Sequence, residues 1–136
     1  MNNTRFATAL HILTLLAKNP HEFLSSEWIA GSLNVNPVVV RRELAVLKAA
    51  QLVESKQGKE GGVRLVKSAT QIDLSDIFLA VQAGEVLGKK NQHPNPNCPI
   101  GKRINEKLDE LFLETQKAIV THLKNKTLAS FSEKFE

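Results

Sequence analysis

The fold of this 136-residue chain is decided by the stretch NVNPVVVRR, residues 34–42. Asn34 is expected at a tight turn, because asparagine tolerates the left-handed backbone that such a turn needs. Asn36 is expected to cap a helix, and Pro37 to lie in its first turn, where proline costs nothing because that N–H has no helical partner anyway. The stretch therefore predicts a three-residue break followed by a helix that runs to about Ala50.

Two amphipathic helices are predicted before this break. Apolar residues recur at three- and four-residue steps over residues 3–18, and Asn19-Pro20 ends that helix because the residue before proline resists the helical region. Ser25 or Ser26 is expected to cap the second helix, whose apolar face consists of Trp28, Ile29 and Leu33. On its own, this three-helix pattern fits any small helical bundle.

A β-hairpin is predicted directly after the third helix. Residues 52–56 and 63–67 are short runs of β-forming side chains, and the glycine-rich run 57–62 joins them. Helix, three-residue turn, helix and hairpin is the order of elements in a winged helix-turn-helix. We therefore predict a mainly α fold with a small β-hairpin wing, followed by a long C-terminal dimerisation helix.

The positive charge of the chain is concentrated in this region. The whole protein has a formal net charge of +4 and a pI of about 9.3. Between Pro37 and Lys67 the sequence holds seven basic residues and three acids, so the excess of four positive charges lies in these residues alone. A basic block inside an otherwise neutral chain indicates a phosphate-bearing partner.

Double-stranded DNA is the partner that this arrangement predicts. The N-terminal part of the second helix of the motif enters the major groove, where Arg41 and Arg42 would bond guanine edges or phosphates and Val38 or Val39 would touch a thymine methyl group. Glu43 is placed among the outward or flanking residues of the same helix. The alternative is that the two arginines form an ordinary solvated helix face and the hairpin an ordinary surface turn. The predicted DNA-binding residues are Asn36, Pro37, Val38, Val39, Arg41, Arg42, Lys48, Lys56, Lys59, Gly61, Gly62 and Arg64.

The remainder of the chain is predicted to hold a short helix from Asp76 to about Ala83, a loop, and a long helix from Pro99 to about Lys126. The apolar stripe of the long helix is too wide for a lone solvent-facing helix, so it packs on a second copy or on the first helix of its own chain. We divide the chain into a DNA-binding domain (1–83), a connecting and sensor loop (84–98), and a dimerisation helix with its tail (99–136). The predicted dimerisation residues are Ile104, Leu108, Leu111, Phe112, Ile119 and Leu123.

Several segments together resemble one bacterial family. They are residues 36–42, 47–55 and 61–65, with further matches at 72–77 and at the closing Thr127-Leu128-Ala129. Over nearly its whole length the chain is similar to the Rrf2 family of winged-helix regulators, which includes the IscR, NsrR and CymR types. The run NPNCPIGK at residues 95–102 is most similar to the YwnA-like subgroup of that family. The resemblance implies a homodimer whose long helices cross and which binds a partly palindromic operator; we expect it to repress transcription.

Cys98 is the one cysteine of the chain and has two interpretations. Several members of the family hold an iron–sulfur cluster on three cysteines in the loop before the long helix, and only the last of these has a counterpart here. Because Cys98 and His93 are too few ligands, we expect no iron–sulfur cluster, no other cofactor and no metal site. As an expected cap of the long helix, the thiol would ionise easily and act as an oxidisable sensor. Alternatively, it is a small buried residue that holds the loop to the dimer.

Other classes of function are excluded or kept as alternatives. The sequence shows no nucleophile–base pair, phosphate-binding glycine loop or carboxylate pair placed for acid–base chemistry, so we predict no enzyme. Two alternatives are a winged-helix module that binds another protein and a thiol redox enzyme centred on Cys98, which lacks a resolving cysteine. No apolar run reaches the ~18 residues of a membrane span, and we expect a cytoplasmic protein whose small-molecule effector is unknown.

Overall fold

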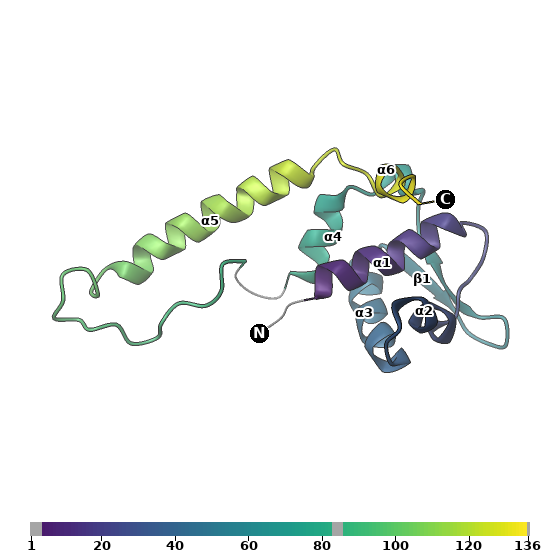
Figure 1. Ribbon diagram of the computed structural model, residues 1–136, viewed down its shortest axis with the longest axis horizontal. Helices are drawn as coiled ribbons and strands as arrows, with labels where there is room; N and C mark the ends of the chain where they lie inside the picture. The colour runs from purple at the N-terminus through teal and green to yellow at the C-terminus, as the bar shows by residue number, and fades with distance from the viewer. Residues whose placement is uncertain (1–3, 83–85, 136) are drawn as a thin grey trace.

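The described part of the chain, residues 4–82 and 86–135 of a computed structural model, is mainly helical with one two-stranded antiparallel sheet (Figure 1). Its N-terminal half contains α1 (Arg5–Lys18), α2 (Ser26–Leu33), α3 (Pro37–Ala49), β1 (Val53–Lys56) and β2 (Gly62–Leu65). Its C-terminal half contains the 3-10 helix η1 (Ala69–Gln71), α4 (Leu74–Val81), α5 (Ile104–Leu123) and α6 (Leu128–Ser132). The predicted fold class, three helices, a hairpin wing and a long C-terminal helix, is confirmed.

The break between α2 and α3 forms as the sequence predicts. Asn34 ends α2 in the left-handed region, with φ 57° and ψ 48°. Asn36 then caps α3, because its side-chain oxygen accepts a hydrogen bond of 2.9 Å from the Val38 amide. Ser25 caps α2 in the same manner by accepting from the Trp28 amide at 3.1 Å. Local side chain–backbone bonds therefore fix both helix starts.

Helices α1, α2, α3, α4 and α6 and the hairpin share one hydrophobic core. Leu13 of α1, Ile29 of α2 and Leu47 of α3 are fully buried in it. The prediction that Trp28 shares the apolar face of α2 is wrong, because its side chain is 51% exposed. On a helix, the residue next to buried Ile29 points about 100° away from it. Trp28 is thus left at the surface of α2.

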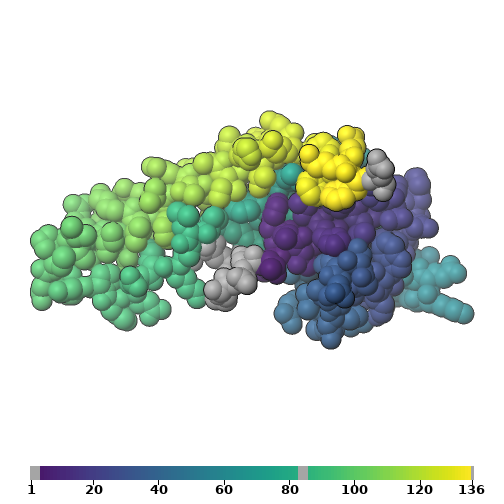
Figure 2. Space-filling model, in the orientation of Figure 1, coloured from purple at the N-terminus to yellow at the C-terminus, as the bar shows by residue number. Residues whose placement is uncertain are grey.

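The linker between α1 and α2 holds the base of the wing. Leu24 and Val63 exchange two backbone hydrogen bonds of 2.9 Å, so residue 24 adds a single antiparallel bridge to the hairpin. Gly62 lies against the Leu24 backbone with φ 153°, and a Cβ at this position would collide with the Leu24 carbonyl oxygen. The wing is therefore fixed at its base, while its tip projects beyond the body of the domain (Figure 2).

The long helix is shorter than predicted. α5 runs from Ile104 to Leu123 instead of from 99 to 126, and residues 99–103 form turns. The helix extends away from the body of the molecule, with the preceding loop beside it (Figure 1). α5 packs on α4. At the C-cap of α4, Gln82 Nε2 donates to Oε1 of Gln116 in α5 at 3.0 Å.

After α5 the chain returns to the core. The Leu74 amide donates to the Lys126 carbonyl at 2.7 Å, and the Leu128 amide donates to the Ile72 carbonyl at 2.8 Å. These bonds bring α6 onto α1, where Leu128 is fully buried. The predicted short helix is observed as α4, which begins two residues earlier than expected; its predicted end, Ala83, lies outside the described residues. No helix in the described part of the chain is long and apolar enough to cross a membrane.

Candidate nucleic-acid interface

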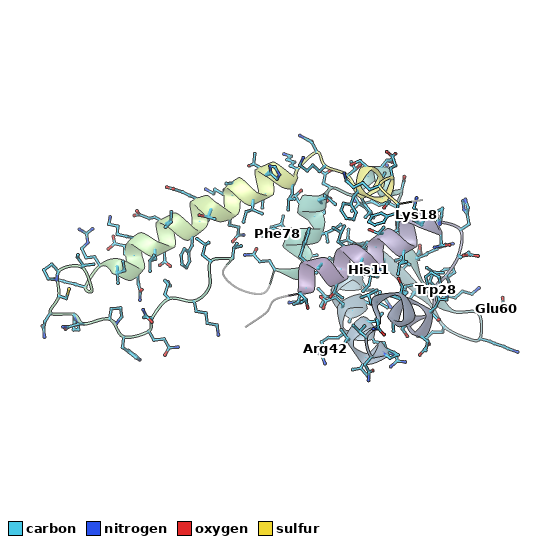
Figure 3. The ribbon with its side chains drawn as sticks, viewed as in Figure 1. His11, Lys18, Trp28, Arg42, Glu60 and Phe78 are labelled. Atoms are coloured by element: carbon cyan, nitrogen blue, oxygen red, sulfur yellow. The ribbon has the colours of Figure 1, made fainter. Side chains whose placement is uncertain are left out.

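The first half of α3 presents apolar and cationic side chains to solvent together. Val38, Val39, Arg41 and Arg42 are exposed, whereas Val40 between them is fully buried and anchors the helix. Figure 3 shows Arg42 pointing away from the body of the domain. The structure thus places these four predicted DNA-binding side chains on accessible positions of one helix, beside the capping residue Asn36 and the half-buried Pro37.

The two adjacent arginines differ in their surroundings. Arg41 Nη2 lies 2.5 Å from Glu27 Oε2 of α2, in an ion pair between two exposed side chains. The pKa of Glu27 is held below its ordinary value, chiefly by a hydrogen bond from its own backbone amide and then by the bond from Arg41. Among the residues that the structure describes, Arg42 has no ion pair. One arginine is therefore held in place and its neighbour is not.

Glu43 faces the core and not the solvent, so its predicted outward or flanking position is wrong. Its side chain is only 7% exposed, and Glu43 Oε1 accepts from Arg5 Nε at 3.2 Å and from Arg5 Nη2 at 3.1 Å. Arg5 is the first residue of α1 and lies 38 residues away in sequence. Helical periodicity does not reveal such a partner, which only the packing of α1 on α3 brings into reach.

Two cations of the wing, Lys56 and Arg64, lie around one aromatic ring. The Arg64 guanidinium lies 4.4 Å from the centroid of Phe23, and Lys56 Nζ lies 5.6 Å from it. Arg64 Nε also lies 3.4 Å from Glu54 Oε2, the residue opposite it in the hairpin. Contacts of this kind between cations and rings hold charged side chains in place. The sequence analysis missed Phe23 as a contact of these two cations, and the signal for it was a single aromatic residue in a short interhelical linker.

The other predicted wing residues have distinct positions. Lys48 Nζ, at the end of α3, donates to Ser55 Oγ of β1 at 2.7 Å. Lys59 is exposed in the hairpin loop, next to Glu60, which Figure 3 shows at the tip of the wing. Gly61 is packed so closely on the Lys56 carbonyl that a Cβ would collide with it. Gly61 and Gly62 therefore shape the wing, whereas Lys59 supplies charge at its end.

An open hollow of about 530 Å³ lies between the wing and the start of α2. Two lysines and two glutamates are among the residues that line it, so charge alone does not favour an anionic ligand here. The lining residues are Glu22, Phe23, Leu24, Ser25, Trp28, Lys56, Lys59, Glu60 and Gly61.

Cys98 lies in the turn before α5, and the prediction that it caps the long helix is wrong. The N-cap position of α5 is occupied by Arg103, five positions later, whose side chain makes no capping bond. In the single chain Cys98 is exposed. The backbone amides of Gly101 and Ile100 donate to its sulfur and lower the pKa of the thiol. Two local N–H groups therefore favour the thiolate, instead of the helix dipole.

The predicted dimerisation residues lie along α5, none of whose residues is fully buried in the single chain. The side chain of Leu111 is 51% exposed, and that of the neighbouring Leu113 is 54% exposed. Helix α4 and the loop before α5 therefore cover the apolar stripe of α5 only in part. The half-buried members of the stripe are Ile104, Leu108, Phe112, Ile119 and Leu123.

Comparison with known proteins identifies the family. The sequence profile described as "Rrf2: Iron-dependent Transcriptional regulator" matches residues 2–134. The chain belongs to the Rrf2 family. It is therefore a transcriptional regulator of the DNA-binding kind and not an enzyme, as the sequence analysis predicts.

The relatives of this Rrf2 protein agree with that assignment. YwnA of Bacillus subtilis (strain 168), named as an HTH-type transcriptional regulator, is 44% identical over 128 residues, which are 94% of each chain. A crystal structure of a protein reported as DNA binding has a TM-score of 0.74 and 40% identity, and covers 93% of this chain and 97% of that one. CymR, the global cysteine regulator of B. subtilis, has a TM-score of 0.73 at 22% identity, over 100% of this chain and 98% of its own. At that identity the likeness to CymR concerns the fold.

The donor set of this Rrf2 protein does not fit the iron that the family description implies. Its whole sequence contains one cysteine, whereas protein iron–sulfur clusters are held mostly by several cysteine thiolates. Within residues 4–82 and 86–135, no group of three or more His, Cys, Asp or Glu side chains is placed to hold a metal ion. We therefore derive no step of its function from a metal.

Proposed function

We propose that this Rrf2 protein is a cytoplasmic homodimer that binds a partly palindromic operator and represses transcription from the adjoining promoter. In this proposal residues 1–83 bind DNA, residues 84–98 connect and sense, and residues 99–136 dimerise. The α3 helix of each protomer enters the major groove, and the wing approaches the neighbouring backbone. A bound dimer blocks the promoter without any chemical reaction.

The observation that carries the proposal is the exposed cationic face of α3 beside a wing with further cations. Arg41 and Arg42 are accessible on α3, and Lys56, Lys59 and Arg64 are on the wing. Arginine bonds guanine edges in the major groove, whereas lysine and arginine at flanking positions neutralise phosphates. The two elements together therefore suit a duplex, in which base edges and phosphates are close to one another.

The proposed dimer rests on α5. This helix extends from the domain and exposes about half of the surface of its leucines. A second copy that covers the helix would remove this apolar surface from water, which is favourable. A two-fold dimer of this kind would present two α3 helices about 34 Å apart, one turn of DNA, which is the reason to expect a palindromic operator.

Two measurements on the purified full chain test this function. We expect sedimentation velocity to give a dimer at micromolar concentration, and DNase footprinting to give a protected site in the region upstream of its own gene. A reporter fused to that promoter should become more active when the regulator is deleted. A monomer at these concentrations, or no protection at low salt, would contradict the proposal and favour a module that binds another protein.

Cys98 supports a second function, a thiol-based redox sensor. Its exposed sulfur, with a pKa lowered by two amides, lies in the loop that joins α4 to the proposed dimerisation helix. The thiolate would attack a peroxide oxygen, break the O–O bond and become a sulfenic acid, while the second oxygen leaves as hydroxide. We expect hydrogen peroxide to weaken operator binding by the wild type and not by Cys98→Ser; equal responses of the two proteins would dismiss the sensor.

A further inference from the structure

The ion pair between α2 and α3 concerns the one arginine of the α3 face whose guanidinium is held. Glu27 lies in the first turn of α2, and its pKa is lowered by hydrogen bonding from its own backbone amide and from Arg41, so the ionised carboxylate is favoured. Arg41 Nη2 of α3 bonds this carboxylate at 2.5 Å, which joins the two helices of the motif through one ion pair.

A held guanidinium reads DNA differently from a free one. Bidentate recognition of guanine needs two N–H groups of arginine in the plane of the base edge. A guanidinium has five N–H donors in a rigid fork, so a carboxylate can fix one side while other donors remain for a base. A long side chain that is already positioned also loses less conformational entropy when it binds.

We propose that Glu27 is a positioning residue that orients the Arg41 guanidinium to read a guanine, so that Arg41 supplies sequence specificity while Arg42 supplies mainly affinity. This inference rests on the proposed function, since it requires α3 to lie in the major groove. Its support is the contrast between two neighbouring side chains: Arg41 is bonded to the Glu27 carboxylate of α2, and Arg42, the next residue, has no ion pair among the described residues.

The measurement is the ratio of two dissociation constants. The full-length protein is first used to select a binding sequence from a random duplex library. Its affinity is then measured for the selected duplex and for a shuffled duplex of the same length and composition. The ratio reports specificity and is insensitive to a change of charge that affects all DNA equally.

Three variants separate position from charge. Glu27→Gln removes the carboxylate, and we expect tighter binding to the shuffled duplex but a specificity ratio about tenfold lower, within the range for one bidentate base contact. Glu27→Asp keeps the charge but withdraws it by one methylene, and we expect a lower ratio with unchanged binding to the shuffled duplex. Glu22→Gln, which removes a charge from the linker before α2, should leave the ratio unchanged. Since exposed ion pairs contribute little to stability, all three variants should keep the thermal midpoint of the wild type.

A double-variant comparison completes the test. In an Arg41→Ala background, Glu27→Gln should no longer change the ratio, because the residue that it positions is gone. A ratio that Glu27→Gln leaves unchanged in the wild type, or lowers equally in both backgrounds, would overturn the inference while operator binding stands. If selection enriches no sequence at all, the proposed function fails as well.

Discussion

Glu43 in the middle of α3 and Arg5 at the start of α1 form a two-bond ion pair, with donor–acceptor distances of 3.2 and 3.1 Å. The carboxylate is largely buried and the guanidinium is one-third exposed. The pair therefore connects the first helix directly to the helix that we assign to the major groove.

Removing Arg5 should destabilise the domain. In Arg5→Ala the Glu43 carboxylate stays buried without these two bonds, so we expect the free energy of unfolding to fall by about 2 kcal/mol. Urea titrations at one fixed protein concentration measure this. Arg103→Ala, which breaks an exposed pair with Glu106, is the control and should change stability by less than about 0.5 kcal/mol. Equal losses in the two variants would contradict the prediction, and Arg5→Ala with Glu43→Leu should recover part of the loss.

Gly62 and Gly31 should respond oppositely to alanine. Gly62→Ala drives a Cβ into the Leu24 backbone, so we expect a lower thermal midpoint and weaker operator binding through a displaced wing. Gly31 lies inside α2 with open space around it, and Gly31→Ala should raise stability by about 0.5–1 kcal/mol. Calorimetry of both variants gives the sign of each change. A stable Gly62→Ala protein with normal DNA affinity would contradict the conclusion that the close contact of Gly62 with Leu24 fixes the base of the wing.

Arg41 and Lys59 should affect DNA binding in different ways. Arg41→Ala removes the proposed base contact from the face of α3, and we expect a loss of about 1–3 kcal/mol on the operator with a relaxed sequence preference. Lys59→Ala removes a charge from the wing and should lower the slope of log affinity against log salt by about one, with little change in sequence preference. Fluorescence anisotropy at several salt concentrations distinguishes the two effects. Wild-type affinity in Arg41→Ala would remove this residue from the interface.

Leu111→Glu should shift the proposed dimer toward monomer. Leu111 is 51% exposed on α5 of the single chain, so a charge there costs the fold little but would be buried by a second copy. We expect the dissociation constant of the dimer to rise at least about tenfold in sedimentation velocity, with operator affinity falling in parallel. Lys117→Glu, at an exposed α5 position outside the stripe, serves as the control. An unchanged dimer in Leu111→Glu would show that α5 does not form the interface.

The Cys98 thiol should react at lower pH in the folded protein than in the unfolded one. Hydrogen bonding from the Gly101 and Ile100 amides lowers the pKa of this thiol below its ordinary value, so a larger fraction is thiolate at neutral pH. The pH midpoint of the iodoacetamide alkylation rate should therefore lie below the midpoint measured in urea. Cys98→Ser controls for other labelled groups. A folded-state midpoint equal to or above the unfolded one would contradict the bonding of the sulfur to these amides.

The sequence alone determined the order of elements and the local starts of helices. Caps, a proline in the first turn, and glycines in a hairpin act over a few residues, so Asn34, Asn36, Pro37 and the wing glycines could be interpreted without a partner. The exposed positions of α3 also followed, because burial of Val40 and the helical period leave the neighbouring residues on the surface.

Only the tertiary structure decided which distant side chains meet. Arg5 with Glu43, Glu27 with Arg41, and Phe23 with the wing cations each join residues from different elements. The start of α5 at Ile104, and with it the true surroundings of Cys98, also depended on turns that periodicity does not encode. Side-chain partners of this kind are set by the packing of whole elements, whereas sequence periodicity reports only the face of one element at a time.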